Sequence, residues 1–209
     1  MHAGSMASDN DPAPFDQIGK RYDESFAERD AQLAEGEWLL SQLDRPARVL
    51  DLGCGSGVPT ARQLLDAGVE VVGVDESRTM LDLAEEQAPG GEYRHQDLRE
   101  VADLGEFDAV VANFSLLMIS KADLPPLLSQ LRSQLRGPGL LQVAMVLGDF
   151  DELPILFLGA PAKVTAYPPD ELTRVVEAAG FEVTNLREIQ AEAEPNRIEV
   201  QIYLRARAV

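Results

Sequence analysis

The 209-residue chain has a single cysteine, few basic residues and no long apolar run. One cysteine, Cys54, excludes an internal disulfide framework and a cysteine-rich zinc site. Eighteen Lys and Arg against 36 Asp and Glu give a formal net charge of −18, which repels nucleic acid and anionic membranes. No apolar run reaches the ~18 residues of a membrane span, and no signal peptide opens the chain. We therefore expect an acidic cytoplasmic protein with no nucleic-acid or membrane partner.

The pattern of apolar residues divides the chain into three parts. Residues 1–14 are small, polar and proline-rich, which predicts a disordered leader. Over residues 15–45 the apolar spacing predicts a helical cap of two amphipathic helices with a break near Gly36. Over residues 46–209 short apolar runs alternate with helical patterns, which predicts an α/β core. With 45% apolar residues, we expect 15–209 to fold as a single domain.

The α/β core is predicted to be a doubly wound, mainly parallel sheet with helices on both faces. The near-continuous apolar runs VEVVGV and FDAVVANF are typical of central strands. The segments FEVTNLREIQ and RIEVQIYLRARA, separated by the polar patch EAEPN, predict an antiparallel pair at one edge. Residues 148–168 are predicted as a long loop of the kind that often covers a binding site.

The strongest motif spans residues 49–57, where an apolar strand runs into a loop with glycine at positions 53, 55 and 57. Glycines there let the backbone turn sharply and let a ligand approach closely. The first strand–helix junction of a doubly wound sheet lies at the edge where ligands bind. A P-loop is excluded because no lysine follows. A dinucleotide fingerprint begins correctly at Gly53 and Gly55 but has Val58 at its sixth position, so an NAD-linked oxidoreductase is retained only as an alternative.

Asp51, two residues before the first glycine, bears on which ligand this loop holds. Its carboxylate is expected to face the loop, where it repels a pyrophosphate and attracts a ligand with an ammonium and a sulfonium. S-adenosylmethionine is such a ligand. The sequence therefore favours a sulfonium nucleoside over a dinucleotide.

The run VLDLGCGSG resembles the first motif of the class I S-adenosylmethionine-dependent methyltransferases of the small-molecule type. The later segments, over residues 47–206, are similar to their seven-stranded Rossmann-like fold. The resemblance implies methyl transfer from S-adenosylmethionine to O, N or C of a small acceptor, with S-adenosylhomocysteine as product, and it makes 148–168 the acceptor-side loop. The Leu, Phe, Ile and Pro residues within 153–167 favour an apolar or aromatic acceptor. A non-methylating S-adenosylmethionine-binding protein is the other alternative, because methyl transfer requires no obligatory catalytic residue.

Strand ends supply the other predicted cofactor residues. Asp75 ends a strand 18 residues after Gly57, where an acid can accept two hydrogen bonds from a ribose diol. Ser77 is the alternative cap of the next helix. By resemblance, Asp97 takes the adenine amino group, and Met80 lies against the adenine face. The predicted cofactor site as a whole is Tyr22, Asp51, Gly53, Cys54, Gly55, Gly57, Asp75, Glu76, Met80, Gln96, Asp97, Leu98, Asn113, Phe114 and Ser115.

The resemblance also assigns the residues near the transferred methyl group. The run 113–115, Asn-Phe-Ser, faces the transferred methyl group, and it departs from the Asn/Asp-Pro-Pro-aromatic run of base-methylating members. Tyr22 of the helical cap touches the methionine end. Methyl transfer from a sulfonium depends mainly on alignment, so a base is optional. The catalytic candidates are His95 and Tyr167, each with a structural alternative, and no metal site is expected.

Overall fold

The computed structural model describes residues 13–26, 29–194 and 197–209. The predicted leader therefore lies outside the described residues, except for Ala13 and for Pro14, which begins a helix. The helices are α1 (Pro14–Ile18), α2 (Arg21–Ser25), α3 (Asp30–Gln42), α4 (Thr60–Asp66), α5 (Arg78–Gln87), α6 (Leu124–Gln134) and α7 (Pro169–Ala178), with short 3-10 turns at Ala102–Leu104 and Leu116–Met118. The strands are β1 (Arg48–Leu52), β2 (Glu70–Asp75), β3 (Glu92–His95), β4 (Phe107–Asn113), β5 (Leu135–Val146), β6 (Phe150–Phe157), β7 (Ala160–Ala166), β8 (Phe181–Glu194) and β9 (Arg197–Ala208).

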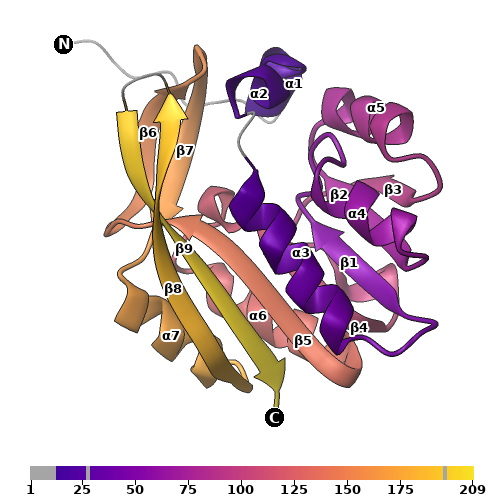
Figure 1. Cartoon of the computed structure of the whole chain (residues 1–209). Helices are drawn as coiled ribbons and strands as arrows, with labels where there is room; N and C mark the ends of the chain where they lie inside the picture. Colours follow the sequence, from indigo (N-terminus) through magenta and orange to yellow (C-terminus); the bar gives the residue numbers. More distant parts are fainter. Residues whose placement is uncertain (1–12, 27–28, 195–196) are drawn as a thin grey trace.

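The main sheet has seven strands in the order β3-β2-β1-β4-β5-β9-β8, which confirms the predicted doubly wound architecture (Figure 1). Strands β1 to β5 pair in parallel, and β9 pairs antiparallel with both β5 and β8, as the sequence predicted for one edge. The order reverses between β1 and β4. The carboxyl ends of these two strands thus flank a topological switch point, where ligands bind in open α/β sheets.

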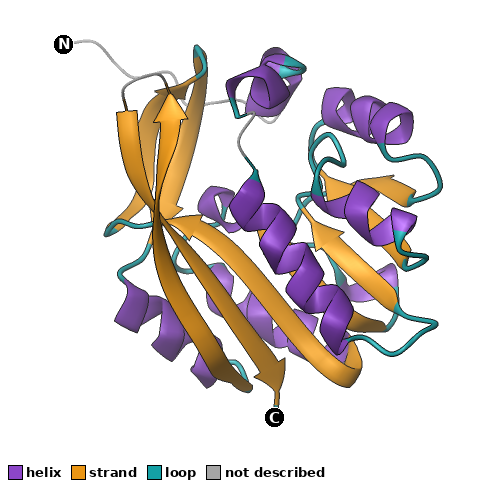
Figure 2. Ribbon diagram, viewed as in Figure 1, coloured by secondary structure: helices purple, strands orange, loops and turns teal. Residues whose placement is uncertain are grey.

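Alternate residues of the central strands pack into two cores on opposite faces of the sheet. Val49 shares a buried cluster with Leu39 of α3 and Leu64 of α4. Leu50, its neighbour in β1, belongs to a second cluster with Leu128 of α6. This alternation follows from the two-residue period of a strand. Figure 2 shows the resulting layers, with α3 and α4 on one face of the sheet and α6 and α7 on the other.

The described part of the helical cap forms three helices instead of the two predicted, and α3 runs through Gly36 without a break. A Cβ at Gly36 would lie 1.9 Å from Oε1 of Gln63, so this glycine permits close packing of α3 on α4. Beside it, the buried carboxylate of Glu35 pairs with Arg187 of β8 at 2.6 Å and with Arg205 of β9 at 2.7 Å. These ion pairs anchor α3 on the sheet.

Within residues 148–168 the structure has an antiparallel hairpin, β6–β7, where the sequence predicted a loop. Phe157 pairs with Ala160, and the two turn residues between them, Leu158 and Gly159, have φ values of 47° and 83°. Two positive φ angles define the type I′ turn that suits hairpins. The prediction was wrong because Leu replaces the usual Asn or Asp before the glycine and because a proline interrupts β6. A two-stranded ribbon tolerates that proline because each of its strands is an edge.

The hairpin and helices α1 and α2 of the cap lie above the carboxyl ends of the parallel strands (Figure 1). Residues of β6, β7, β8, β9 and the cap line one common cavity, so these segments are neighbours in space despite their distance in sequence. In the described residues, no helix combines the length and the apolar character that a membrane crossing requires. The candidate ligand site therefore lies between the cap, the hairpin and the switch point.

Candidate active site

The three glycines of the loop after β1 serve different purposes. A Cβ at Gly53 would lie 2.1 Å from the Ser115 side chain, and one at Gly57 would lie 3.0 Å from Ala88. A Cβ at Gly55 would meet nothing within 4 Å, and its φ is +53°. Gly53 and Gly57 therefore permit close packing of the protein on itself. Gly55 alone faces open space, where a ligand can approach the backbone.

Asp75, at the end of β2, is tied to the glycine loop. Its carboxylate accepts hydrogen bonds from the backbone N–H of Gly55 and from that of Ser77, both at 2.9 Å. The Ser77 hydroxyl caps α5 by accepting from the N–H of Met80 at 3.1 Å. Burial raises the pKa of Asp75 to about 6, although these two hydrogen bonds act in the opposite direction. Because a carboxylate has about four acceptor sites, Asp75 keeps capacity to bind hydroxyl groups in the cleft.

Two buried acceptors beside the loop have no donor within the described structure. Asp51 is 2% exposed, and its Oδ2 atom has no hydrogen-bond partner. Burial, and secondarily the charge of Asp75, raises the pKa of Asp51 to about 7. The Oδ1 atom of Asn113 is also without a partner, whereas its Nδ2 donates to Thr60 at 3.0 Å. Unpaired buried acceptors are costly, so this corner is suited to a ligand that brings donors or positive charge.

Most of the predicted cofactor residues line one cleft of about 1520 Å³. They are Tyr22, Asp51, Gly53, Cys54, Gly55, Asp75, Glu76, Met80, Leu98, Asn113, Phe114 and Ser115. The residues Gly57, Gln96 and Asp97 lie outside this lining. The carboxylate of Asp97 is held by Arg99 at 2.6 Å, and Arg99 itself lines the cleft.

The two catalytic candidates lie in different places. His95 lines the cleft, with Nε2 at 2.9 Å from the backbone oxygen of Glu76. Tyr167 is 1% exposed, packs in the core, and lies beneath the ammonium of Lys121 at 4.8 Å from the ring centroid. Burial raises the pKa of Tyr167 to about 12. The structure thus brings His95 to the cleft and keeps Tyr167 outside it. In the described residues no cluster of His, Cys, Asp or Glu is arranged to hold a metal ion.

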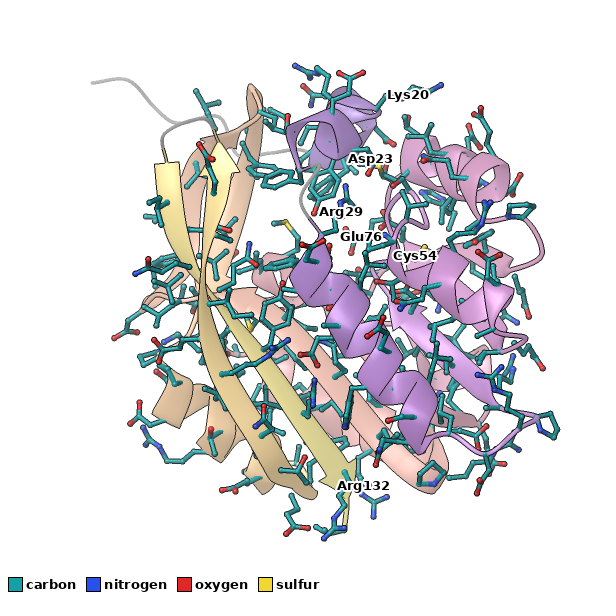
Figure 3. The ribbon with its side chains drawn as sticks, in the orientation of Figure 1. Lys20, Asp23, Arg29, Cys54, Glu76 and Arg132 are labelled. Atoms are coloured by element: carbon teal, nitrogen blue, oxygen red, sulfur yellow. The ribbon has the colours of Figure 1, made fainter. Side chains whose placement is uncertain are left out.

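The helical cap is fastened to the cleft by two carboxylates that the sequence analysis missed. Asp16 accepts from the Ser77 hydroxyl at 2.6 Å and from the N–H of Thr79 at 3.2 Å. Asp23 accepts from the Ser56 hydroxyl at 2.9 Å, and it pairs with Arg29 at 2.7 Å. Figure 3 shows Asp23 and Arg29 above Cys54 and Glu76. No local pattern marks either acid, because the serines that fasten them to the cleft lie 61 residues from Asp16 and 33 residues from Asp23.

A second cavity, of about 700 Å³, adjoins the cleft. Both are lined by Phe15, Tyr22, Arg29, Gln32, Phe114, Met118 and Ile155. Phe114 is a non-glycine residue with φ of 59°, a strained conformation that is frequent at functional sites. Its ring meets that of Tyr203 edge-on, with centroids 6.1 Å apart. Phe114 therefore stands at the junction of the two spaces.

Four aromatic rings join the cap to the hairpin over this junction. Phe15 and Tyr22 have ring centroids 5.8 Å apart, and Tyr22 and Phe26 have centroids 5.0 Å apart. Phe157 of β6 stacks on Phe26 at 5.9 Å. The apolar run 153–157, Leu-Pro-Ile-Leu-Phe, is the sequence signal that could have indicated a strand here. We call these four rings the aromatic roof.

The strand order, the glycine loop at the switch point and the antiparallel last pair together define a Rossmann-like methyltransferase fold. A family model described as a methyltransferase domain matches residues 25–186, and the chain belongs to this family. The structure of the DhpI–SAH complex has a TM-score of 0.69 and 21% identity, with 93% of each chain covered.

Two curated relatives extend the family comparison. The ubiquinone biosynthesis O-methyltransferase of Mesorhizobium japonicum is 32% identical over 120 residues, which are 54% of this chain and 46% of that protein. The trans-aconitate 2-methyltransferase of Azoarcus sp. is 35% identical over 122 residues, which are 57% of this chain and 47% of that protein. The chain thus matches about half the length of these relatives.

Proposed function

We propose that this protein is an S-adenosylmethionine-dependent methyltransferase that transfers a methyl group to O, N or C of a small, apolar or aromatic acceptor. One observation carries the proposal: the cleft beside the glycine loop and the apolar cavity share a wall at Tyr22, Phe114 and Met118. A transferase needs two adjoining compartments, one for each reactant. Family membership and the names of the relatives support the same activity.

The residues of the cleft fit the proposed cofactor. Asp75 is suited to hold the ribose hydroxyls, because its carboxylate keeps free acceptor capacity. The unpaired oxygens of Asp51 and Asn113 are suited to the donors and positive charge of the methionine part. Met80 and Leu98 supply apolar surface for the adenine. When bound, the cofactor supplies an electrophilic methyl group attached to a sulfonium.

The chain's own contribution to catalysis is positioning and exclusion of water. The roof residue Tyr22, the strained Phe114 and Met118 surround the junction where the two reactants meet. Holding a nucleophile in line with a methyl group lowers the barrier without a proton transfer. His95 lines only the cleft, and Tyr167 lines neither space, so we assign no general base. An oxygen acceptor is supported by the relative named as an O-methyltransferase.

The acceptor is proposed to be a small molecule of the cytoplasm. The lone cysteine, Cys54, agrees with a reducing compartment. The net charge of −18 disfavours a polyanionic acceptor. The walls of the cavity are rich in Phe, Leu and Ile side chains, which favour apolar or aromatic molecules.

Radiolabelled methyl transfer tests the proposal. Purified protein with methyl-labelled S-adenosylmethionine is incubated with a library of aromatic phenols, amines and acids, and labelled small-molecule product is expected. Cofactor binding in calorimetry without any labelled product would favour the non-methylating alternative. Binding of NADH in a fluorescence titration, without binding of S-adenosylmethionine, would favour the oxidoreductase alternative.

A further inference from the structure

A line of polar side chains crosses the cavity along β9. Glu199, Gln201 and Tyr203 alternate along the strand, so they face the same side of the sheet, and all three line the cavity. The Tyr203 hydroxyl lies 2.9 Å from Oε1 of Gln201, and Nε2 of Gln201 lies 2.9 Å from Oε1 of Glu199. We call these three residues the β9 stripe.

The chemistry of these groups fixes the direction of both hydrogen bonds. A carboxylate only accepts, so Gln201 donates its amide N–H to Glu199 and turns its carbonyl oxygen to Tyr203. Tyr203 must then donate to that carbonyl. Burial raises the pKa of Tyr203, so the hydroxyl keeps the proton it donates. Apart from the second amide hydrogen of Gln201, the stripe thus offers the cavity acceptors: the Glu199 carboxylate and the lone pairs of the Tyr203 oxygen.

The charged residues around the β9 stripe also favour a ligand that donates hydrogen bonds or carries positive charge. Among the described residues that line the cavity, Arg29 is the only cation, and the carboxylates are those of Asp30, Glu192 and Glu199. The guanidinium of Arg29 already has hydrogen-bond and ion-pair partners within the chain. Its Nε donates to the backbone oxygen of Phe26 at 2.6 Å, Nη1 donates to the backbone oxygen of Val58, and Nη2 pairs with Asp23. An acceptor with a carboxylate would therefore find no uncommitted cation among these residues and would face repulsion from Glu199.

Resting on the proposed function, we propose that the acceptor is an elongated apolar molecule with an amine at one end, held by Glu199, and its methylated atom at the other. Four residues of strand separate Glu199 from Tyr203, which is ~13 Å at the rise of an extended chain. Tyr203 touches Phe114 at the junction with the cleft. The amine is thus a recognition group far from the reacting atom, and Glu199 is a specificity-determining residue.

Three probes with one skeleton test this assignment: 6-(4-hydroxyphenyl)hexylamine, 6-(4-hydroxyphenyl)hexanoic acid and 4-hexylphenol. Each is titrated by calorimetry into protein saturated with S-adenosylhomocysteine and into cofactor-free protein. We expect the amine to bind about tenfold tighter than the neutral phenol and the acid to bind most weakly. Glu199→Gln is expected to remove the advantage of the amine, and Glu199→Lys to reverse the preference in favour of the acid.

The matched control is Glu188→Gln, which removes the same charge from an exposed site on the neighbouring strand β8, outside the cavity. It should keep the preference for the amine, and thermal unfolding checks that all variants are folded. The proposal is overturned if the acid binds as tightly as the amine, if Glu199→Gln keeps the preference, or if no probe binds. Failure of S-adenosylhomocysteine to bind would instead refute the proposed function, while the cofactor-free titrations still decide the role of Glu199.

Discussion

The cleft and the cavity differ in how the chain builds them. The floor of the cleft is made by the ends of adjacent strands, within residues 51–56, 75–77 and 113–115, and residues of the cap and the hairpin line its other side. The cavity is made by side chains from segments far apart in sequence, chiefly residues 15–32, 150–164 and 189–203. A compartment built from strand ends is constrained by the sheet and by local motif. One built from a cap, a hairpin and an edge strand is free to vary in shape and charge, which suits the reactant that differs among relatives.

The first test is a substitution that disrupts the cleft and leaves the cavity unchanged. Gly55→Val places a branched side chain in open space at φ of +53°, so we expect cofactor affinity to fall more than about 100-fold in calorimetry. The backbone strain itself costs about 1–2 kcal/mol of unfolding free energy. Gly90→Val is the control, because Gly90 has φ of +104° and open space but does not line the cleft. Retained binding in Gly55→Val would mean that the ligand does not approach this loop.

The sequence predicted the cleft better than the cavity, for a physical reason. Strand-end acids such as Asp75 and loop glycines such as Gly55 lie directly after apolar runs, so their place follows from the strand. Asp23 carries no such signal, because its partner Ser56 is brought to it only by tertiary packing. Tyr203 and the hairpin were missed similarly. The turn at Leu158 lacks the residues that normally indicate it. Tyr203 lies in β9, which pairs with a strand on each side, and the sequence does not show which face of that strand borders a cavity.

The second test weakens one contact of the cleft. Asp75→Asn keeps the shape but loses the charge that accepts hydrogen bonds from the ribose hydroxyls. We expect S-adenosylmethionine binding to weaken by about 1.5–3 kcal/mol, which is about 10–150-fold in Kd. Asp82→Asn, on the exposed face of α5, makes the same change outside the cleft and should leave Kd unaltered. Equal affinities for wild type and Asp75→Asn would remove the ribose assignment.

The third test separates function from stability at Asp51. Its pKa is raised from 3.8 to about 7, mainly by burial, so the folded state binds this proton more tightly than the unfolded state does. The contribution of Asp51 to the stability of the ligand-free protein therefore falls as the pH rises from about 4 through about 7. Asp51→Asn should raise the free energy of unfolding by on the order of 1–3 kcal/mol at pH 8, with a smaller gain as the pH falls toward 4.

Urea unfolding at pH 5 and pH 8 measures this difference for wild type and Asp51→Asn. The same variant should bind S-adenosylmethionine about tenfold more weakly at pH 8, because the buried negative charge is gone. A stabilisation that is equal at both pH values would show that the charge of Asp51 is not its source. Unchanged affinity would show that Asp51 does not contact the positively charged ligand.

The smallest change in affinity is expected from a substitution in the aromatic roof, which tests the cavity and leaves the cleft unchanged. Phe157→Ala removes the ring that stacks on Phe26, a contact worth about 0.5–1.5 kcal/mol beyond its area. The Kd of 4-hexylphenol should rise about tenfold, and that of S-adenosylhomocysteine less than about threefold. Phe157→Leu keeps much of the apolar volume, so its Kd for 4-hexylphenol should lie between those of the wild type and Phe157→Ala. If both ligands weaken equally, the roof belongs to the cleft as much as to the cavity.

The two kinds of contact that hold the cap imply an order of ligand exchange. Toward the cavity, the described contacts of α1 and α2 with the hairpin include the rings of the aromatic roof, which separate without breaking a hydrogen bond. Toward the cleft it is also fastened by Asp16 and Asp23, whose bonds must break before that side opens. The side with the weaker fastening opens more often. For the proposed methyltransferase we therefore expect the methylated acceptor to leave before the nucleoside, so that in each cycle the nucleoside binds first and leaves last.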